Sequence, residues 1–165
     1  MKAIVAVDKN WGIGKNNDLL FSIPEDMKFF RSTTLNKVVV MGANTLRSFP
    51  NGNPLKNRVN IVLSTTILRD DCIVCKSMEE LSSVIKNYNT DDVFIIGGAR
   101  FYQTMLDYVS EIYVTKVDAD GCADVFFPNL DNNPNWELKS VSEKNTSNGY
   151  DFYFTTYKNK NVKKF

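Results

Sequence analysis

Six short runs rich in Val and Ile are the sequence feature that most constrains the fold of this chain. They cover residues 3–7, 38–41, 60–63, 72–75, 93–96 and 112–117. Each run is nearly continuous in apolar residues rather than alternating, which is typical of strands that are covered on both faces in a mostly parallel sheet. Helical spacing of apolar residues separates several of the runs, at residues 24–33, 77–86 and 100–108, and a short helical turn is expected after Gly42. Strands that alternate with helices predict an α/β sandwich.

Two further runs, residues 136–142 and 150–157, predict a closing antiparallel hairpin, with Asn148-Gly149 as the tight turn. The expected fold is therefore α/β, with a mostly parallel central sheet of about eight strands and about four flanking helices. Ser22 and Glu25 have the spacing of a capping box at the start of the first helix. The chain shows no linker or repeat, so residues 1–165 are expected to form a single domain, with a solvated Lys-rich tail at residues 158–165.

The 165 residues include no histidine, which excludes Ser-His-Asp and Cys-His catalysis and His-ligated metals. Lys plus Arg number 20 and Asp plus Glu number 19, so the net charge of +1 favours neither nucleic acid nor an anionic membrane as a partner. No apolar run approaches the roughly 18 residues of a membrane span, and we expect a cytoplasmic protein. Cys72 and Cys75 form a C-x-x-C that supplies only two zinc ligands. We therefore expect these thiols and Cys122 to be reduced, and expect no metal.

Three long stretches lack a clear period: residues 8–23, 49–59 and 118–130. Loops of this length in a compact domain are usually functional, and residues 8–23 are expected to form a lid. Within them, Gly12-Ile13-Gly14 offers freedom for a hinge. A dinucleotide-binding glycine fingerprint is not favoured there, because the third glycine is missing.

Asp26 is the leading candidate for chemistry. It lies near the start of a predicted helix, where the helix dipole alone also favours an acidic residue, and it can share a face with Met27 and Phe30. A carboxylate in such apolar surroundings is costly unless a ligand pairs with it. A heterocycle with adjacent ring N–H and amino groups could donate two hydrogen bonds to it.

Three other positions remain open between a structural and a binding role. Gly97-Gly98 joins a strand to a helix, which suits either a phosphate or a tight turn. Arg58, at a loop exit, could clamp a carboxylate or be a solvated surface residue. Ser64-Thr65, directly after a strand, could bind phosphate or begin a turn.

Taken in order, the segments resemble the dihydrofolate reductase family from residue 2 to about residue 157. The matching strings are Gly12-Ile13-Gly14 with Leu19, Ile23-Pro24-Glu25-Asp26-Met27 with Phe30, Lys37–Gly42 with Thr45, Asn57–Ser64, Ile95–Tyr102, Ile112–Thr115 and Asp124–Pro128. Ile95-Ile96-Gly97-Gly98-Ala99-Arg100-Phe101-Tyr102 is the most specific of them. The resemblance implies a single-domain, bacterial-type enzyme that reduces 7,8-dihydrofolate with NADPH in support of one-carbon metabolism and thymidylate synthesis. Antifolates are the implied inhibitors, and a monomer is the default.

The resemblance also implies roles for individual residues. Asp26 would hold the pterin ring, Thr115 would link to Asp26, Tyr102 would lie near the nicotinamide, and Arg58 would clamp the glutamate α-carboxylate. The implied wall of the substrate pocket comprises Ile4, Val5, Met27, Phe30, Phe49, Leu55 and Ile96. The implied cofactor-binding residues are Ala6, Ile13, Gly14, Leu19, Gly42, Ala43, Asn44, Thr45, Leu63, Ser64, Thr65, Lys76, Ile96, Gly97, Gly98, Ala99, Arg100, Phe101 and Tyr102. Among them, Ser64, Thr65 and Lys76 are candidates for the adenosine 2′-phosphate.

Two departures from the family pattern matter. Leu20-Phe21 stands where the family usually has Pro-Trp, so Phe21 would fill the catalytic position without an indole N–H, and we expect an active enzyme with altered loop behaviour. Ala43-Asn44 stands where a basic pair often meets the 2′-phosphate, which makes tolerance of NADH more expected than usual.

Two alternatives compete with dihydrofolate reduction. One is a related reductase of the same fold, such as the pyrimidine reductase of riboflavin synthesis, which would not need Asp26 together with Arg58. The other is a non-catalytic folate or nucleotide carrier.

Overall fold

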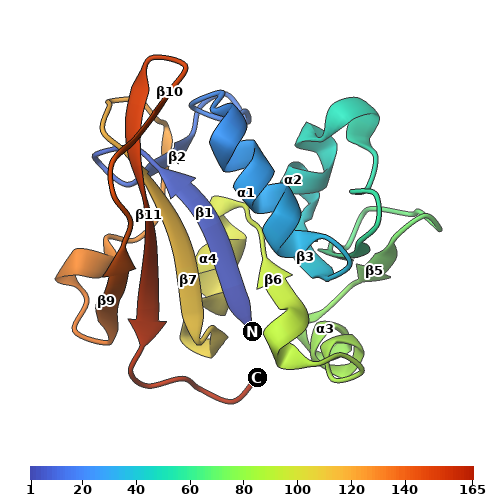
Figure 1. Ribbon diagram of the computed structural model, residues 1–165. Helices are drawn as coiled ribbons and strands as arrows, with labels where there is room; N and C mark the ends of the chain where they lie inside the picture. The colour runs from blue at the N-terminus through green and yellow to red at the C-terminus, as the bar shows by residue number, and fades with distance from the viewer.

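The computed structural model describes residues 1–165 and contains eleven strands and four α-helices (Figure 1). The strands are β1 (Lys2–Val7), β2 (Gly12–Gly14), β3 (Val38–Gly42), β4 (Val59–Leu63), β5 (Ile73–Cys75), β6 (Val93–Ile95), β7 (Glu111–Val117), β8 (Val125–Phe126), β9 (Trp136–Val141), β10 (Asn145–Ser147) and β11 (Tyr150–Asn159). The helices are α1 (Pro24–Thr34), α2 (Ala43–Ser48), α3 (Met78–Ile85) and α4 (Ala99–Met105).

The central sheet runs in the order β10-β11-β7-β1-β6-β3-β4-β5, and β9 pairs with β11 beside β10. All pairs from β7 through β1, β6, β3 and β4 to β5 are parallel, whereas β11 pairs antiparallel with β7, β9 and β10. This confirms the mostly parallel sheet and its antiparallel C-terminal end. The loops that follow the parallel strands all begin at the carboxyl ends of the strands. We call this side the sheet edge, and it is where open α/β sheets bind ligands.

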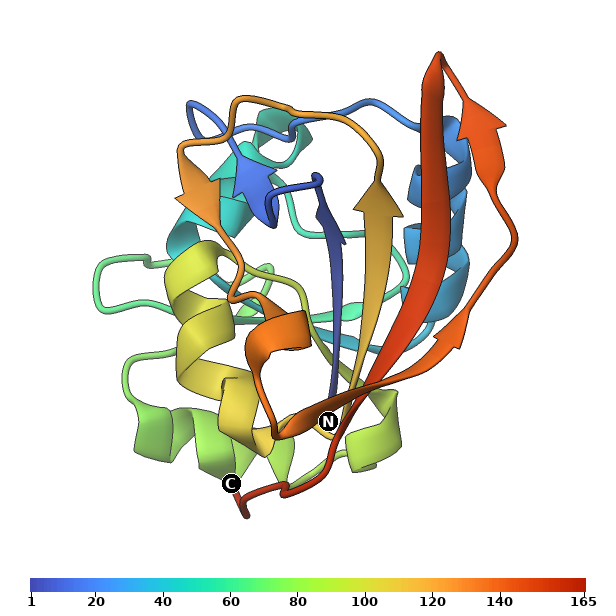
Figure 2. The ribbon, with the colours of Figure 1, turned by 90° about the vertical axis from the view of Figure 1, so that its left-hand side faces the viewer.

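Helices cover both faces of the sheet, and Figure 2 shows α1 on one side with α3 and α4 on the other. The α1-side core consists of Ile4, Val39, Met41, Leu46, Val62, Phe94 and Ile96. The larger core on the opposite face includes Val5, Val40 and Ile95, and α4 contributes Phe101 and Met105 to it. Neighbouring residues of one strand thus enter opposite cores, which is why the strands read as continuous apolar runs.

The start of α1 differs from the capping-box prediction. Ile23 is the N-cap residue, and no side chain caps the helix. Pro24 occupies the first helical position, where its fixed φ suits a helix and its missing N–H costs nothing. The backbone carbonyl of Ser22 instead accepts a hydrogen bond from the side-chain amide of Asn148, at 2.7 Å. A proline start has therefore replaced the predicted Ser22–Glu25 box.

Residues 8–23 are not wholly irregular, because Gly12–Gly14 forms β2 and pairs with β8 from the third long loop. A Cβ atom on Gly12 would lie 2.4 Å from the Cβ of Ala123, so this glycine permits close contact of two segments rather than a hinge. A three-residue strand is too short to show a period, and the two loops therefore read as separate irregular segments.

At the C-terminal end, Asn148 and Gly149 both have positive φ (53° and 83°), which confirms the predicted tight turn between β10 and β11. The tail at residues 158–165, which was predicted to be solvated, is only partly exposed to solvent. Asn159 is buried in β11 and donates to the carbonyl of Val109, and Phe165 lies edge-on to Tyr108 with ring centroids 5.0 Å apart. The side chains of residues 160–164 are exposed. None of the helices combines the length and apolar character that crossing a membrane requires.

Candidate active site

Asp26 and Thr115 form the centre of the candidate site. Asp26 lies in the first turn of α1, and Thr115 lies in β7, where it pairs with Ala6 of β1. The hydroxyl of Thr115 donates to Oδ1 of Asp26 at 2.6 Å across 89 residues of sequence. Thr115 is 2% exposed, so the contact lies under the first turn of the helix rather than on the surface. The predicted link between these two side chains is thus formed directly.

The electrostatics of Asp26 are unusual for a structural carboxylate. It forms no salt bridge, and Thr115 is its only side-chain hydrogen-bond partner, so Oδ2 remains available to a ligand. Burial raises the pKa of the Asp26 carboxyl above its ordinary value, and the hydrogen bond from Thr115 opposes that rise. A half-buried carboxylate without a cation is suited to bind a ligand that carries N–H donors or a positive charge.

Tyr102 lies on α4 and is buried in the core on that side of the sheet. Its hydroxyl donates to the carbonyl of Ile4 at 2.7 Å, and its ring meets Phe127 edge-on at 5.1 Å. Burial raises the pKa of Tyr102 well above its usual value, and the Asp26 carboxylate adds to the rise. Tyr102 therefore stays protonated and ties α4 to the middle of β1.

Most of the predicted apolar wall faces the α1 side of the sheet. Ile4 and Ile96 belong to the α1-side core, and Phe30, Phe49 and Leu55 pack against it. Met27 is 58% exposed, which places it at the rim rather than in the wall. Val5 differs from the prediction: its side chain enters the opposite core, because alternate residues of β1 point to opposite faces. Only its backbone can face the site.

Arg58 lies at the far end of α1 from Asp26. Its Nη1 donates to the hydroxyl of Thr34 at 3.3 Å, and its Nε donates to the carbonyl of Lys56 at 2.9 Å. It forms no salt bridge, and both burial and the neighbouring guanidinium of Arg31 lower its pKa from the ordinary value. Two cations that lie close together without a carboxylate form a suitable anion site.

Asn60 holds the loop that carries Arg58, although sequence reasoning did not select it. This buried side chain accepts from the N–H of Leu55 at 2.9 Å and donates to the carbonyls of Leu55 and Arg58 at 2.9 and 3.1 Å. An amide within an otherwise apolar strand was the available signal, because buried polar groups are retained where they are fully hydrogen-bonded.

The Gly97-Gly98 junction brings together several predicted cofactor-binding residues. The peptide bond between the glycines is cis, and Gly97 has a φ of +121°. A Cβ atom there would lie 3.2 Å from the Tyr102 ring and 3.4 Å from the hydroxyl of Thr45, so only glycine fits. The N–H of Gly42 donates to the carbonyl of Gly97 at 2.9 Å. The junction therefore lies against the start of α2, with Gly97 buried and Gly98 partly accessible.

Around this junction the predicted residues divide into two groups. Gly98 and Ala99 are half-buried and Arg100 is exposed at the start of α4, so all three can face a ligand. Phe101 is 6% exposed and packs in the core on the α4 side, which differs from its predicted cofactor contact. Helical geometry points it inward, away from Arg100.

A hollow of about 440 Å³ lies at the same sheet edge, between α2, the end of β4 and the turn before α3. It is lined by Ala43, Leu63, Ser64, Thr65, Lys76, Ser77 and Met78. Five of these seven were predicted to contact the cofactor, including all three candidates for the 2′-phosphate. The structure thus brings together five predicted cofactor-binding residues, of which Ala43 and Lys76 are 33 positions apart in the sequence.

The predicted lid, residues 8–23, is joined to residues 118–127. The buried carboxylate of Asp8, which sequence reasoning missed, accepts hydrogen bonds from the N–H groups of Asn10, Gly12 and Gly121 at 2.8, 2.7 and 3.1 Å. The N–H of Asn16 donates to Asp124 at 3.0 Å. An Asp at the end of an apolar strand gave no distinct signal, because its partners are backbone groups.

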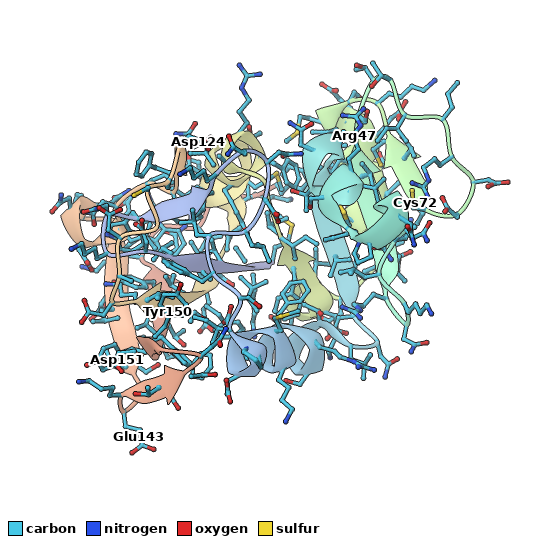
Figure 3. The ribbon with its side chains drawn as sticks, turned by 90° about the horizontal axis from the view of Figure 1, so that it is seen from above. Arg47, Cys72, Asp124, Glu143, Tyr150 and Asp151 are labelled. Carbon is cyan, nitrogen blue, oxygen red and sulfur yellow. The ribbon has the colours of Figure 1, made fainter.

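Leu19 lies at the tip of the predicted lid and is 73% exposed. Ile13, in β2, is partly buried and packs against the larger core. Phe21 packs with Ile23, Val117 and Phe152 and stacks edge-on to Tyr150 at 4.9 Å. Figure 3 labels Tyr150 and Asp124 on the same half of the molecule, and they contact Phe21 and Asn16 of this segment. The residue in the family's Trp position is therefore anchored by aromatic contact.

A second hollow, of about 450 Å³, lies on the other side of α1 between Phe29, Tyr113, Phe154 and residues 140–142. None of the predicted site residues lines it. All three cysteine thiols are free, and no group of three or more Cys, Asp or Glu side chains is placed to hold a metal ion.

Together, the carboxyl ends of the parallel strands, the half-buried carboxylate of Asp26 and the hollow beside α2 are typical of an α/β domain that binds small molecules at an enzyme-like site. Comparison with known proteins makes the class specific. The sequence profile described as dihydrofolate reductase matches residues 1–159. Proteins named dihydrofolate reductase match from Buchnera aphidicola of Acyrthosiphon pisum (34% identity, covering 92% of this chain and 94% of that protein), Bacillus subtilis (34%, 98% and 95%) and Schistosoma mansoni (36%, 95% and 95%).

The chain therefore belongs to the dihydrofolate reductase family. It is an oxidoreductase, and membership implies reduction of dihydrofolate with a nicotinamide nucleotide. The resemblance inferred from the motifs is confirmed.

Proposed function

We propose that the protein reduces 7,8-dihydrofolate to 5,6,7,8-tetrahydrofolate with NADPH, by hydride transfer from nicotinamide C4 to pterin C6 and protonation of N5 through water. The observation that carries this proposal is Asp26: a half-buried carboxylate with one hydroxyl partner, no cation and a free Oδ2. The adjacent ring N–H and 2-amino groups of a pterin supply the missing donors. A pyrimidine reductase would not need Asp26 together with Arg58, and oxidation of NADPH distinguishes a reductase from a carrier.

The distance between Asp26 and Arg58 along α1 supports a substrate with two recognised ends. Thr34, which accepts a hydrogen bond from Arg58, lies eight residues after Asp26, or roughly 12 Å at 1.5 Å per residue. The wall between them is apolar, with Phe30, Phe49 and Leu55. A flat polar ring at one end, an aromatic middle and a carboxylate at the other match dihydrofolate. Planar antifolates that donate to Asp26 are the expected inhibitors.

The residues at the sheet edge fit NADPH. Gly97 packs closely on Tyr102 and Thr45, which holds the Gly97-Gly98 backbone beside the start of α2. The hollow lined by Ala43 also presents Ser64, Thr65 and Lys76, two hydroxyls and a cation suited to a phosphate. When bound, the reduced nicotinamide supplies the hydride. The protein's part is to align the two rings and to exclude bulk water.

The proton for N5 has no donor among the side chains near Asp26. Tyr102 is held protonated and its hydroxyl is already committed to the carbonyl of Ile4. Asp26 engages the opposite edge of the ring. We therefore assign delivery to water admitted by residues 8–23, while the Asp26 carboxylate favours the protonated substrate electrostatically.

Replacing Asp26 with Asn tests the proposal. We expect dihydrofolate-dependent oxidation of NADPH by the wild-type protein, and a loss of turnover in Asp26→Asn of roughly 10²–10⁴-fold at neutral pH, the range for a positioned acid–base group. Turnover of the variant should recover partly in acid, where solvent protonates the substrate. The measurement is kcat and kcat/KM for both proteins across a pH series.

Asp70→Asn is the matched control, because Asp70 is exposed and forms no side-chain hydrogen bond. It should retain wild-type turnover. Unchanged turnover in Asp26→Asn would refute the assignment. Oxidation of NADPH only with a ribosylamino-pyrimidine would favour the related reductase, and binding of folate without any oxidation would favour a carrier.

A further inference from the structure

Arg47 is the one arginine at the cofactor side that no role described so far explains. It lies in α2, four residues after Ala43, and its side chain is exposed. Residues four apart share a face of a helix, so Arg47 lies one turn, roughly 5.4 Å, from the residue that lines the hollow. Figure 3 labels it on α2, far from Tyr150.

The guanidinium of Arg47 is folded back toward the start of α2. Its Nη1 donates to Oδ1 of Asn44 at 3.2 Å, and side chains of helical residues lean toward the N-terminus of their helix. Arg47 forms no salt bridge, whereas Arg69 in the neighbouring loop is paired with Asp71. Asn44 therefore holds a guanidinium without a carboxylate partner near the start of α2, the helix whose first residue, Ala43, lines the hollow.

The positive charge around the hollow is too small to balance a phosphate monoester. A monoester dianion carries about 1.5 to 2 negative charges at neutral pH. Lys76 is the only charged side chain that lines the hollow, since Ala43, Ser64, Thr65 and Ser77 are neutral. The nearby carboxylate of Glu80 accepts a hydrogen bond from the backbone N–H of Lys76 at 2.7 Å, which adds negative charge close by. A second cation is needed, and Arg47 is placed to supply it.

We propose that Arg47, oriented by Asn44, is a specificity-determining residue that binds the 2′-phosphate of the cofactor and so favours NADPH over NADH. This proposal rests on the proposed function, in which the hollow receives the adenosine end. The forked guanidinium can donate two parallel hydrogen bonds to phosphate oxygens. The neutral pair Ala43-Asn44 is then compatible with NADPH, because the charge comes from the next turn of the helix.

The binding of two adenosine fragments tests the proposal without measuring turnover. The probes are 2′,5′-ADP, which carries the 2′-phosphate, and 5′-AMP, which lacks it, and the measurement is calorimetry. Arg47→Gln should weaken 2′,5′-ADP by roughly 10–100-fold, the loss expected for a charge-assisted hydrogen bond, and leave 5′-AMP within about twofold. Arg47→Lys should fall between, since it keeps the charge but loses the fork.

Asn44→Ala tests the orienting contact. It should weaken 2′,5′-ADP less than Arg47→Gln does, and the double variant should be no weaker than Arg47→Gln alone. In turnover, Arg47→Gln should lower the ratio of kcat/KM for NADPH to that for NADH through KM, with kcat within about twofold. Lys164→Ala, which removes one exposed charge from the tail, is the control and should change neither probe.

Two outcomes overturn the proposal in distinguishable ways. If the wild-type protein prefers 2′,5′-ADP and Arg47→Gln keeps the full preference, Arg47 has no such role and the NADPH assignment stands. If the wild-type protein binds both fragments equally, the hollow does not recognise a 2′-phosphate, and both the role of Arg47 and the NADPH preference fail.

Discussion

At the scale of single residues, Asp26 is expected to cost stability in exchange for activity. Burial raises its pKa in the folded state, so its contribution to stability is fully present below the ordinary pKa, roughly 4, and is lost as the pH rises through the folded-state pKa. At neutral pH the folded protein therefore holds a partly desolvated charge that the unfolded chain leaves in water.

Asp26→Asn should accordingly raise the melting temperature at neutral pH while it abolishes most turnover. The Asn side chain can still accept the hydrogen bond from Thr115 and carries no charge. A domain of this size gains roughly 2–4 °C per kcal/mol, so a rise of a few degrees is expected. Thermal unfolding followed by circular dichroism at neutral pH and near pH 4 measures it.

The gain should shrink in acid, because the wild-type carboxyl is then neutral in both states. Asp70→Asn should show no gain at either pH. A lower melting temperature for Asp26→Asn at neutral pH would mean that the carboxylate is structural, which contradicts its assignment as a ligand-binding group.

Sequence reasoning could select a residue where it stood out from its surroundings. Asp26 in an apolar helix face and Gly97-Gly98 between a strand and a helix were both selected, and the structure places Asp26 against Thr115 and Gly97 against Tyr102 and Thr45. Val5 and Phe101 were carried over from family motifs, but they point into the opposite core. A motif records positions along the chain, and which face a side chain enters depends on strand and helix phase.

At the scale of elements, the predicted lid, residues 8–23, is held in place by a second segment, residues 118–127. The carboxylate of Asp8 accepts N–H groups from both segments, and β2 pairs with β8. Hydrogen bonds to a charged group contribute roughly 1.5–3 kcal/mol each. The position of residues 8–23 therefore depends on residues 118–127.

Asp8→Asn should loosen the predicted lid, because the amide nitrogen of Asn cannot accept a hydrogen bond. Trypsin should then cleave faster at the exposed Lys15, and kcat should fall more than the affinity for 2′,5′-ADP. Asp18→Asn is the control within the lid, since the Asp18 carboxylate accepts only from the N–H of Leu19. If Asp8→Asn lowers the melting temperature but leaves cleavage at Lys15 unchanged, Asp8 stabilises the fold and not the lid.

Elements with a clear apolar pattern were predictable. The parallel strands, including the three-residue β5 and β6, follow from their Val- and Ile-rich runs, and α3 follows from its helical spacing, whereas β2, β8 and β10 have no comparable run. Such strands form because a distant segment pairs with them. The local sequence alone therefore does not predict them. The start of α1 shows the same limit, since Pro24 overrides the local capping pattern.

At the scale of the whole molecule, the parallel sheet assembles the site from segments that are remote in sequence. The ends of β1, β3, β4 and β6 leave the sheet at one edge, so residues 8–23, Gly42, Ser64 and Gly97 become neighbours of one ligand path. Strand order was not predictable from the runs alone, because parallel strands of similar composition offer many pairings. The order β10-β11-β7-β1-β6-β3-β4-β5 comes from the structure alone.

The absence of histidine agrees with this architecture. A reaction in which the cofactor supplies hydride and water supplies the proton needs alignment and a fixed carboxylate, and imidazole has no necessary part in it. Asp26, Thr115 and Tyr102 meet that requirement through three elements of the fold.

The most direct test of the central claim follows the hydride itself. The purified protein is mixed with dihydrofolate and NADPH that carries deuterium at both C4 positions of the dihydronicotinamide, and the folate product is examined by NMR and mass spectrometry. The account predicts tetrahydrofolate with one deuterium at C6 and none at another carbon, formed far more slowly by Asp26→Asn. Unlabelled tetrahydrofolate, deuterium at another carbon, or no reduced folate at all would contradict it.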